Sequence, residues 1–436
     1  MLRKHVTISI IDRKNQVEQR ELSLQQDNVK VEEREGRSRN TIMNLWRSVF
    51  WMSFPLGVMS FLLPIYGKEL GASAVEIGGM FTAFSIVPAI IRPFLGRALD
   101  RWGRKPFLMI GLGGYLIATF LFSLADSVFL LMIGRLLQGV GSAFLWISLF
   151  TMLADLSEPS THGYEFGSID EASSRGAIIG TTLGLAGIFA LQSFFEISFQ
   201  ETWFWLFLAF IIPALMAFLC GWKGTRETLP ADISPEIRGK TISKQLLALM
   251  GIVFATGASQ AMVWPLLLIF LQDRLGAGID LLVIAYLPAA LISSFLPSRM
   301  GKITDRWGRK APMIIGLLIG ALASLAIPHL KVVLTLVALW CLETIGFTIS
   351  VPAERAFVAD IAGKDIRGTS YGLYTFSYFL GSALGPLAGG WLYDHISQAT
   401  PFYLNAMVLV IGAILVALIL KEPGRGKAGS AATVNT

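Results

Sequence analysis

The sequence spells one basic decapeptide twice, and this repetition decides the fold. Residues Gly96–Lys105 read GRALDRWGRK and residues Gly301–Lys310 read GKITDRWGRK, so seven of the ten positions agree at an offset of 205 residues. The same offset aligns further landmarks without a gap: Gly111-Leu112 with Gly316-Leu317, Ala154-Asp155 with Ala359-Asp360, and Gly176, Gly180 and Gly184 with Gly381, Gly385 and Gly389. The second half of the chain is therefore predicted to repeat the first.

Composition places both halves in a membrane. Of the 436 residues 54% are hydrophobic and 15% are charged, whereas a soluble domain carries about a quarter charged residues. Apolar runs of ~20 residues are long enough to cross a ~30 Å hydrocarbon core. Twelve such segments lie near residues 44–66, 78–96, 107–125, 128–153, 169–190, 203–222, 246–270, 281–300, 311–329, 333–358, 371–392 and 402–420. We predict an all-α membrane protein of twelve transmembrane helices in two pseudo-symmetric six-helix bundles.

The loops between these segments predict the domains and the orientation. The expected parts are an N-terminal tail (1–43), a first bundle (44–222), a linker (223–245), a second bundle (246–420) and a C-terminal tail (421–436). With the N-terminus inside, 28 of the 36 Lys and Arg residues fall in the tails and cytoplasmic loops, and three fall on the other side. Basic loops stay cytoplasmic, so both termini are predicted to face the cytoplasm from the cell membrane. The charges are divided among short loops, so a nucleic-acid surface is not expected.

The decapeptide also resembles a known signature. DRWGRK, between helices 2 and 3 and again between helices 8 and 9, looks like the loop signature of the major facilitator superfamily, and the resemblance covers roughly residues 44–421. It implies a secondary transporter whose two parallel halves hold a substrate site between them near the middle of the membrane. Within that superfamily the helix count and signatures look closest to the drug:proton antiporters.

The resemblance further implies a gate that joins the halves on the cytoplasmic side when the carrier is open to the outside. Its expected members are Gly96, Asp100, Arg101, Gly103, Arg104, Asp155, Asp305, Gly308, Arg309 and Asp360. The expected contacts are Asp100 with the start of helix 11 at Ser370, Asp305 with the start of helix 5 at Ser168, Asp155 with Arg104, and Asp360 with Arg309. In the alternative interpretation the basic residues of these loops only fix the topology.

Helix 4 carries a polar stripe. Residues Arg135–Ala143 read RLLQGVGSA and resemble the family signature RxxQGxGxA, which links Arg135 to proton transfer. Arg135, Gln138, Ser142 and Trp146 share one helix face, and we expect this face to line the substrate cavity. Further expected cavity walls are Trp51, Gln260 and Trp264. The alternative for Arg135 is a structural arginine bonded to backbone carbonyls.

Helix 11 contains a motif that resembles the antiporter signature of the family. Residues Gly381–Gly390 read GSALGPLAGG, but in the family this motif belongs to helix 5, where the present chain has Thr181 in place of the proline. The displacement weakens the case for antiport. Small residues at this spacing allow close helix approach, so we expect a packing role for Gly176, Gly180, Gly184, Gly381, Gly385, Pro386 and Gly389.

Glu343 is the leading candidate for proton coupling. It lies about ten residues into helix 10, roughly 15 Å deep, and the 205-residue offset places it on Gln138. A carboxylate at that depth is costly when charged, which suits it to binding and releasing a proton. In the alternative interpretation neighbouring polar groups hold Glu343 for packing specificity.

Other intramembrane charges are weaker candidates. Asp170, Glu171 and Arg175 lie just inside helix 5 and are either proton-coupling residues or a solvated helix start. Glu354 and Arg355 are expected to snorkel or to join the gate, and Arg92 is expected to snorkel.

The sequence thus predicts a transporter and not an enzyme. We expect proton-coupled export of an amphipathic solute by alternating access, from a monomer in a lipid bilayer. Proton symport of a metabolite and a transporter-like receptor that moves nothing are the alternatives. No GxxxxGK[ST] loop is present, so direct ATP drive is not expected. Cys220 and Cys341 lie in different apolar helices, and neither a metal site nor a cofactor is predicted.

Overall fold

The computed structural model describes residues 36–59, 62–72, 74–195, 197–229, 242–275, 279–330, 332–362 and 366–423, and regular structure within these ranges is helical. The first half comprises the helical segments Gly36–Met59 and Leu62–Glu69 and the helices α2 (Ala74–Trp102), α3 (Lys105–Ser123), α4 (Val128–Leu156), α5 (His162–Phe195) and α6 (Phe199–Gly224). The second half comprises α7 (Lys244–Leu275), α8 (Ile279–Phe295), α9 (Pro297–Trp307), α10 (Lys310–Ala326), the short 3₁₀ helix η1 (Ile327–His329), α11 (Val333–Ile361), α12 (Arg367–His395) and α13 (Thr400–Ile419). Of the predicted linker, residues 230–241 lie outside the described ranges.

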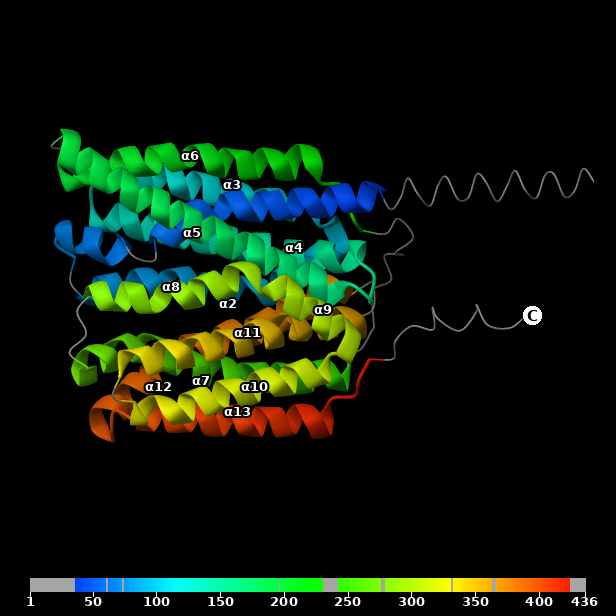
Figure 1. Cartoon of the computed structure of the whole chain (residues 1–436). Coiled ribbons are helices and arrows are strands. Elements are labelled where there is room, and N and C mark those ends of the chain that lie inside the picture. The colour runs from blue at the N-terminus through cyan, green and yellow to red at the C-terminus, as the bar shows by residue number, and fades with distance from the viewer. Residues whose placement is uncertain are drawn as a thin grey trace, which may run out of the picture.

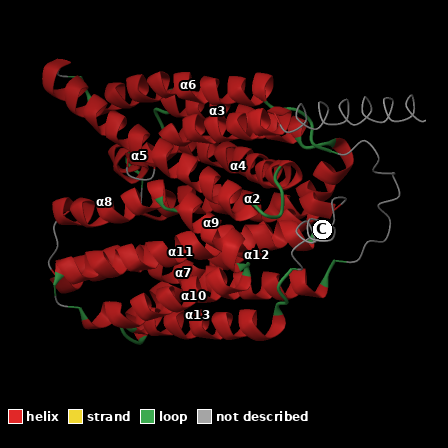
Figure 2. Ribbon diagram, turned by 45° about the vertical axis from the view of Figure 1, so that its right-hand side comes forward, coloured by secondary structure: helices red, strands yellow, loops and turns green. Residues whose placement is uncertain are grey.

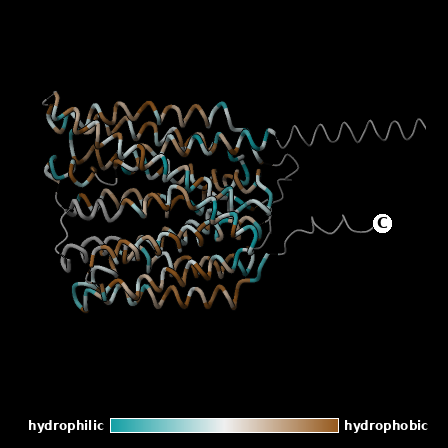
Figure 3. Tube along the Cα trace, in the orientation of Figure 1, coloured by the Kyte–Doolittle hydropathy of each residue, from teal (hydrophilic) through white to brown (hydrophobic). Residues whose placement is uncertain are grey.

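The helices run side by side in one bundle, with the two halves stacked (Figures 1 and 2). α3 and α6 lie at one side and α10 and α13 at the other, while α2, α5, α8, α9 and α11 fill the region between them. Apolar residues dominate the helices, and hydrophilic residues gather toward the helix ends (Figure 3). This distribution fits elements whose sides face lipid and whose ends face water.

Length and composition agree with the twelve predicted segments. Among the described residues nine helices are long and apolar enough to cross a membrane, and the segments Gly36–Met59 and Leu62–Glu69 pass the same test together. Two predicted spans fall outside that count. α12 has 29 residues but is rich in Gly, Ser and Tyr, and α8 has only 17 residues.

The prediction of one continuous helix over residues 281–300 is wrong. α8 ends at Phe295, and α9 begins at Pro297 as a separate polar helix of 11 residues. Pro297 has no backbone N–H to donate, so one helical hydrogen bond is absent at this point. In the first half the equivalent α2 runs unbroken for 29 residues although it contains Pro88 and Pro93. The two halves therefore differ at this helix.

Glycines allow the helices to approach closely within each half. A Cβ at Gly381 or Gly385 of α12 would collide with the backbone of α7 at Phe254 or Ala258, and one at Gly389 would collide with Met262. The repeat-related positions are Gly176, Gly180 and Gly184 of α5, which face Phe50, Phe54 and Val58 of the first helical segment. Pro386, from the same motif of α12, faces an internal cavity instead.

The two halves meet mainly where α2 packs on α12 and where α5 packs on α8 and α9, with further contacts of α11 with α5 and of α12 with α4. The repeated loops lie at one end of these packed helices, which we call the repeat-loop end. Gly103 and Gly308 turn the chain there with φ of 96° and 92°, a conformation that glycine adopts without the steric cost of a Cβ. The duplicated decapeptide thus occupies equivalent places in the two halves.

Candidate functional site: an internal cavity and the contacts between the halves

Asp100 joins the halves at the repeat-loop end. The Asp100 carboxylate, 3% exposed, accepts hydrogen bonds from the backbone N–H of Gly368 (2.9 Å) and of Thr369 (2.8 Å), and from Thr369 Oγ1 (2.7 Å). The first N–H groups of a helix lack intrahelical partners and carry partial positive charge, so a carboxylate is stabilised there. The expected contact with Ser370 is replaced by contacts with the two preceding residues, because they provide the free N–H groups at the start of α12.

Asp305 makes the equivalent contact in the other direction. Its two carboxylate oxygens accept hydrogen bonds from the N–H groups of Gly163 (2.8 Å) and Tyr164 (2.9 Å) at the start of α5. The expected partner Ser168 instead donates its hydroxyl to the Glu165 carbonyl within α5. Ser168 is already inside the helix, where the backbone N–H groups are used by the helix itself. Each half thus places a carboxylate at the first turn of a helix in the other half, where it accepts hydrogen bonds from the backbone.

Ion pairs surround both carboxylates. Arg104 Nε lies 3.1 Å from Asp155 Oδ2, and Arg309 Nε lies 2.7 Å from Asp360 Oδ2, as expected from the resemblance. Both guanidinium groups also reach the aspartate of their own loop, at 3.4 Å from Asp100 and 2.7 Å from Asp305. The pairs are buried, so removing one partner would leave an uncompensated buried charge and would be strongly destabilising.

Further contacts cross between the halves. Arg367 of α12 donates to Asp155 of α4 at 3.0 Å, and His162, the first residue of α5, lies 2.7 Å from Asp360 of α11. Arg101, which was also predicted for the gate, is exposed and lies over the ring of Trp102.

The helix-5 charges also contact the second half. Asp170 accepts a hydrogen bond from Arg355 Nη1 of α11 at 2.6 Å. Glu171 pairs with Arg175 at 2.8 Å, and both side chains reach the junction of α8 and α9. None of the three is a solvated helix start in this arrangement. Their predicted role in proton coupling stays a prediction.

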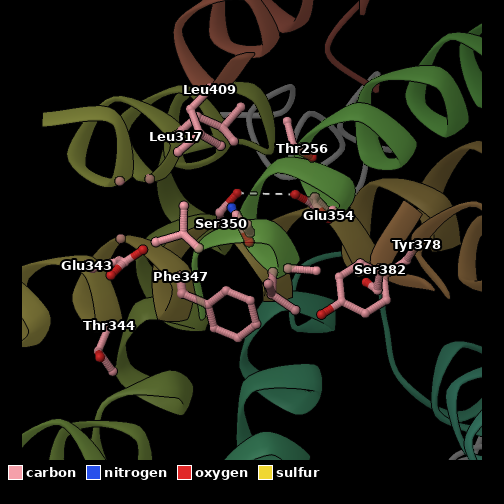
Figure 4. Close-up of a pocket in the computed structure, with 18 of the residues that line it drawn as sticks. Thr256, Leu317, Glu343, Thr344, Phe347, Ser350, Glu354, Tyr378, Ser382 and Leu409 are labelled. Atoms are coloured by element: carbon pink, nitrogen blue, oxygen red, sulfur yellow. Dashed lines mark hydrogen bonds between the residues drawn. The ribbon is translucent and has the colours of Figure 1, made fainter. Parts of the chain in front are cut away.

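A cavity of about 540 Å³ lies inside the second half (Figure 4). The described residues that line it all belong to the second half. The substrate site predicted between the halves stays a prediction. Its polar and aromatic lining includes Thr256, Gln260, Ser293, Glu343, Thr344, Phe347, Ser350, Glu354, Tyr378 and Ser382. In this conformation α2 packs on α12, and α5 packs on α8 and α9.

Two carboxylates of α11 face this cavity. Figure 4 shows Glu343 and Glu354 on either side of Ser350. Glu354 accepts hydrogen bonds from Ser350 Oγ (3.3 Å) and Tyr374 Oη (3.0 Å). No hydrogen bond or ion pair to Glu343 occurs within the described part of the chain. The expectation that Glu354 snorkels or joins the gate is therefore wrong, because the 11-residue spacing returns it to the cavity-facing side of the helix.

The polar stripe of α4 lies elsewhere, inside the first half. Arg135 donates from Nη1 to Gln138 Oε1 (2.6 Å) and from Nε to the Met80 carbonyl (3.2 Å). Its guanidinium also lies 4.6 Å from the ring centre of Phe84. The ring of Phe81 lies on the guanidinium as well, at 5.2 Å. These contacts fit the structural alternative stated for Arg135, and its predicted role in proton transfer stays a prediction.

Of the remaining residues predicted to line the substrate cavity, one lines the cavity of the second half and most of the others lie elsewhere. Gln260 lines the cavity. Gln138 and Ser142 are buried in the first half, Trp146 packs on Phe150 of its own helix, and Trp51 packs on Phe54. The Trp264 side chain lies outside what the structure describes.

Arg92 does not snorkel. It is 1% exposed, donates to the Ser142 carbonyl at 3.4 Å, and its guanidinium lies 4.1 Å from the ring centre of Phe379 on α12. The close packing of α2 against α12 encloses this side chain, which the first-half sequence alone could not reveal.

Sequence reasoning missed two glutamates. Glu227 accepts hydrogen bonds from the N–H groups of Arg104 (2.8 Å) and Lys105 (3.0 Å), and Glu422 accepts them from Arg309 (2.5 Å) and Lys310 (3.0 Å). Each glutamate stands three residues beyond the last helix of its half, after Gly224 and Ile419. This shared position after the last helix was a signal in the sequence. The two glutamates are 195 residues apart, however, so the constant offset of 205 does not align them.

The architecture is that of a polytopic membrane transporter built from two equivalent halves. The family model described as Major Facilitator Superfamily matches residues 45–329 and 249–435, and the chain belongs to this superfamily. The resemblance stated from the repeated loops is confirmed. The protein is accordingly a multi-pass transporter of the cell membrane and not an enzyme. Among the described residues no group of three or more His, Cys, Asp and Glu side chains is placed to hold a metal ion.

Curated relatives match nearly the full chain. Multidrug resistance protein 1 of Bacillus subtilis (strain 168) is 27% identical over 399 residues, which are 89% of this chain and 98% of that protein. Quinolone resistance protein NorA of Staphylococcus aureus (strain MRSA252) is 23% identical over 390 residues, which are 87% and 96% of the two chains. The crystal structure of the human organic anion transporter MFSD10 (TETRAN) superposes with a TM-score of 0.72 at 18% identity, covering 87% of this chain and 99% of that one. This last likeness concerns the fold.

Proposed function

We propose that the protein exports amphipathic, positively charged compounds in exchange for protons by alternating access. The observation that carries this proposal is the cavity of about 540 Å³, where the Glu343 carboxylate meets no protein partner among the described residues. The names of the relatives, multidrug resistance protein and quinolone resistance protein, support drug efflux.

The cavity lining favours an amphipathic cation. Its volume suits a drug-sized molecule, and apolar side chains such as Val263, Leu317 and Phe347 supply contact area. Glu343 and Glu354 supply negative charge, and no Lys, Arg or His stands among the described lining residues. A cationic group would bind an unpaired carboxylate strongly in a site shielded from water.

Competition for one carboxylate provides the coupling. Ionised Glu343 attracts a cationic substrate, whereas protonated Glu343 is neutral and does not. A proton that arrives from one side therefore displaces the substrate, and loss of that proton on the other side allows the next substrate to bind. Glu354 is less suited to this exchange because Ser350 and Tyr374 already donate hydrogen bonds to it.

The orientation follows from the basic loops. The repeat-loop end carries Arg104, Lys105, Arg309 and Lys310, and basic loops are retained in the cytoplasm. In this proposal both termini are cytoplasmic, and the contacts of Asp100 and Asp305 close the cytoplasmic side. Opening that side requires these contacts to separate, with the two six-helix bundles as the moving bodies.

Proteoliposomes with an imposed pH gradient test the proposal. With a fluorescent lipophilic cation as the substrate, the wild-type protein should move the cation across the membrane in the direction opposite to the proton flow. Glu343→Gln gives the second half the residue that the first half has at the equivalent position, Gln138. It should abolish substrate-evoked proton flux and weaken cation binding by about 10- to 100-fold. Glu354→Gln is the matched control and should retain proton coupling.

The same assay separates the alternatives. Accumulation of the solute in the direction of proton movement would indicate symport, and binding without any flux would indicate a receptor. Unchanged proton-to-substrate stoichiometry in Glu343→Gln would show that another residue carries the proton.

A further inference from the structure

Glu171 and Arg175 replace one backbone hydrogen bond of the helix facing them. In a continuous helix the Ser298 N–H would donate to the Ser294 carbonyl, four residues earlier. Here the Ser298 N–H donates to Glu171 Oε1 at 3.0 Å, Arg175 Nη2 donates to Glu171 Oε2 at 2.8 Å, and Arg175 Nε donates to the Ser294 carbonyl at 2.7 Å. We call this chain of contacts the Ser298–Ser294 bridge.

The bridge falls at the break between α8 and α9. Leu296 N still bonds to the Ile292 carbonyl (2.9 Å) and Met300 N to the Leu296 carbonyl (3.0 Å), so helical bonding continues on both sides. Pro297 has no N–H. The Ser298 N–H is therefore a donor at the break that can bond either to the helix or to α5.

The charges also match the two helix ends that they contact. Glu171 lies at the N-terminus of α9, where partial positive charge develops, and Arg175 lies at the C-terminal end of α8, where the charge is partially negative. The Arg175 guanidinium also lies 4.8 Å from the ring centre of Phe295. The ion pair thus stabilises two ends that a continuous helix would not have.

The equivalent interface, between α2 and α12, supplies an internal comparison. At the 205-residue offset Glu171 and Arg175 correspond to Phe376 and Leu380 on α12. α12 packs against α2, which is unbroken over Ala74–Trp102. The charged pair and the helix break occur together in one interface and are both missing from the equivalent one.

We propose that Glu171 and Arg175 are positioning residues that keep α8 and α9 as two separate helices while the repeat-loop end is closed. When that end opens and α5 moves away, the Ser298 N–H returns to the Ser294 carbonyl, and α8 and α9 become one helix kinked at Pro297. Glu171 and Arg175 stay paired with each other on α5. The inference rests on the gate opening that the proposed function requires.

The exchange leaves the backbone groups paired in both states. A buried backbone N–H or carbonyl without a partner is costly inside a membrane protein, and each state supplies one partner for each group. α9 also carries Asp305, whose carboxylate binds the start of α5. The break therefore allows α9 to stay against α5 at two points, Ser298 and Asp305, independently of α8.

Pulsed electron paramagnetic resonance on the full-length protein in nanodiscs tests the inference. One pair of spin labels at Leu287 and Trp307, both exposed, reports the distance across the break. A second pair at Trp102 and Trp307 reports the separation of the halves at the repeat-loop end. The test variant is Glu171→Phe with Arg175→Leu, which copies the residues of the equivalent interface. The control is Asp170→Asn, which removes a neighbouring contact between the halves and leaves the bridge intact.

In the double variant we expect the Leu287–Trp307 distance to move to one narrow value near the ~30 Å of a continuous helix. The ratio of closed to open molecules at the Trp102–Trp307 pair should fall by about 10- to 100-fold, because charge-assisted hydrogen bonds between the halves are lost. In Asp170→Asn the ratio should also fall, but closed molecules should keep the wild-type Leu287–Trp307 distance.

The inference would be overturned if open molecules of the double variant kept the Leu287–Trp307 distance of closed wild-type molecules, because Pro297 alone would then maintain the break. If the distance changes as expected in a protein that shows no flux in proteoliposomes, the inference stands and the proposed transport function fails. The two proposals are therefore tested separately.

Discussion

Arg355 of α11 donates a hydrogen bond to Asp170 of α5 at 2.6 Å, directly beside Glu354, which lines the internal cavity. Neighbouring residues of one helix thus face in different directions, one toward the cavity of the second half and the other toward the first half. The side chains of Arg355 and Asp170 are 16% and 24% exposed. A solute bound beside Glu354 would therefore contact the residue next to Arg355, which belongs to an ion pair that joins the halves.

This pair is predicted to couple the two halves energetically. Asp170→Asn and Arg355→Gln should each destabilise the closed state, and the double variant should cost less than the sum of the single variants by about 1–3 kcal/mol. The measurement is the closed-state population from the Trp102–Trp307 label pair in all four proteins. Strict additivity would show that the two side chains act independently.

The crossing of α5 and α9 is predicted to tolerate no side chain at Gly163. A Cβ there would lie 2.5 Å from the Gly301 carbonyl oxygen, which is backbone and has little room to move. Gly163→Ala should therefore destabilise the closed state by about 1–3 kcal/mol, measured as a shift toward open molecules. Gly251→Ala is the control, since nothing lies within 4 Å of a Cβ at that position in α7, and it should leave the population unchanged. An equal effect of both substitutions would contradict the steric explanation.

The two glutamates that follow the last helix of each half are predicted to stabilise the fold. Glu227→Ala and Glu422→Ala each remove the acceptor for two N–H groups at the start of α3 or α10. Loss of such a cap costs about 0.5–2 kcal/mol, so the melting temperature in detergent should fall in both variants. Glu69→Ala removes an exposed glutamate and should not lower it. Melting temperatures like that of the wild-type protein would exclude a capping role.

Arg135 is predicted to act through its two fixed hydrogen bonds. Arg135→Lys keeps the charge but cannot serve both Gln138 and the Met80 carbonyl with the same planar geometry, so we expect a loss of about 1–3 kcal/mol in stability. The proton-to-substrate stoichiometry should stay at the wild-type value in proteoliposomes. A changed stoichiometry in a stably folded Arg135→Lys protein would favour the proton-transfer role that the family resemblance implies.

The sequence predicted contacts at the repeat-loop end better than contacts inside the bundle. The pairs of Arg104 with Asp155 and of Arg309 with Asp360 were implied by the family resemblance of the repeated loops, and the structure contains both. The contacts of Asp100 and Asp305 were placed at the correct helix starts, but with residues one to five positions too far along, because the free N–H groups belong to the first turn. The predictions that Arg92 snorkels and that Glu354 snorkels or joins the gate were wrong. A membrane helix is apolar on most sides, so periodicity does not show which neighbour each side meets.

The sequence by itself determined the membrane location, the twelve helical segments and the repetition of one half in the other. Apolar length and repeated motifs are properties of the linear chain, since every spanning segment must satisfy its own backbone hydrogen bonds as a helix. Only the tertiary structure decided that the cavity lies in the second half, that helix 8 is broken at Pro297, and that Glu171 and Arg175 occupy the break. These features depend on which faces of separate helices come together, and such contacts join residues more than a hundred positions apart, such as Glu171 and Ser298.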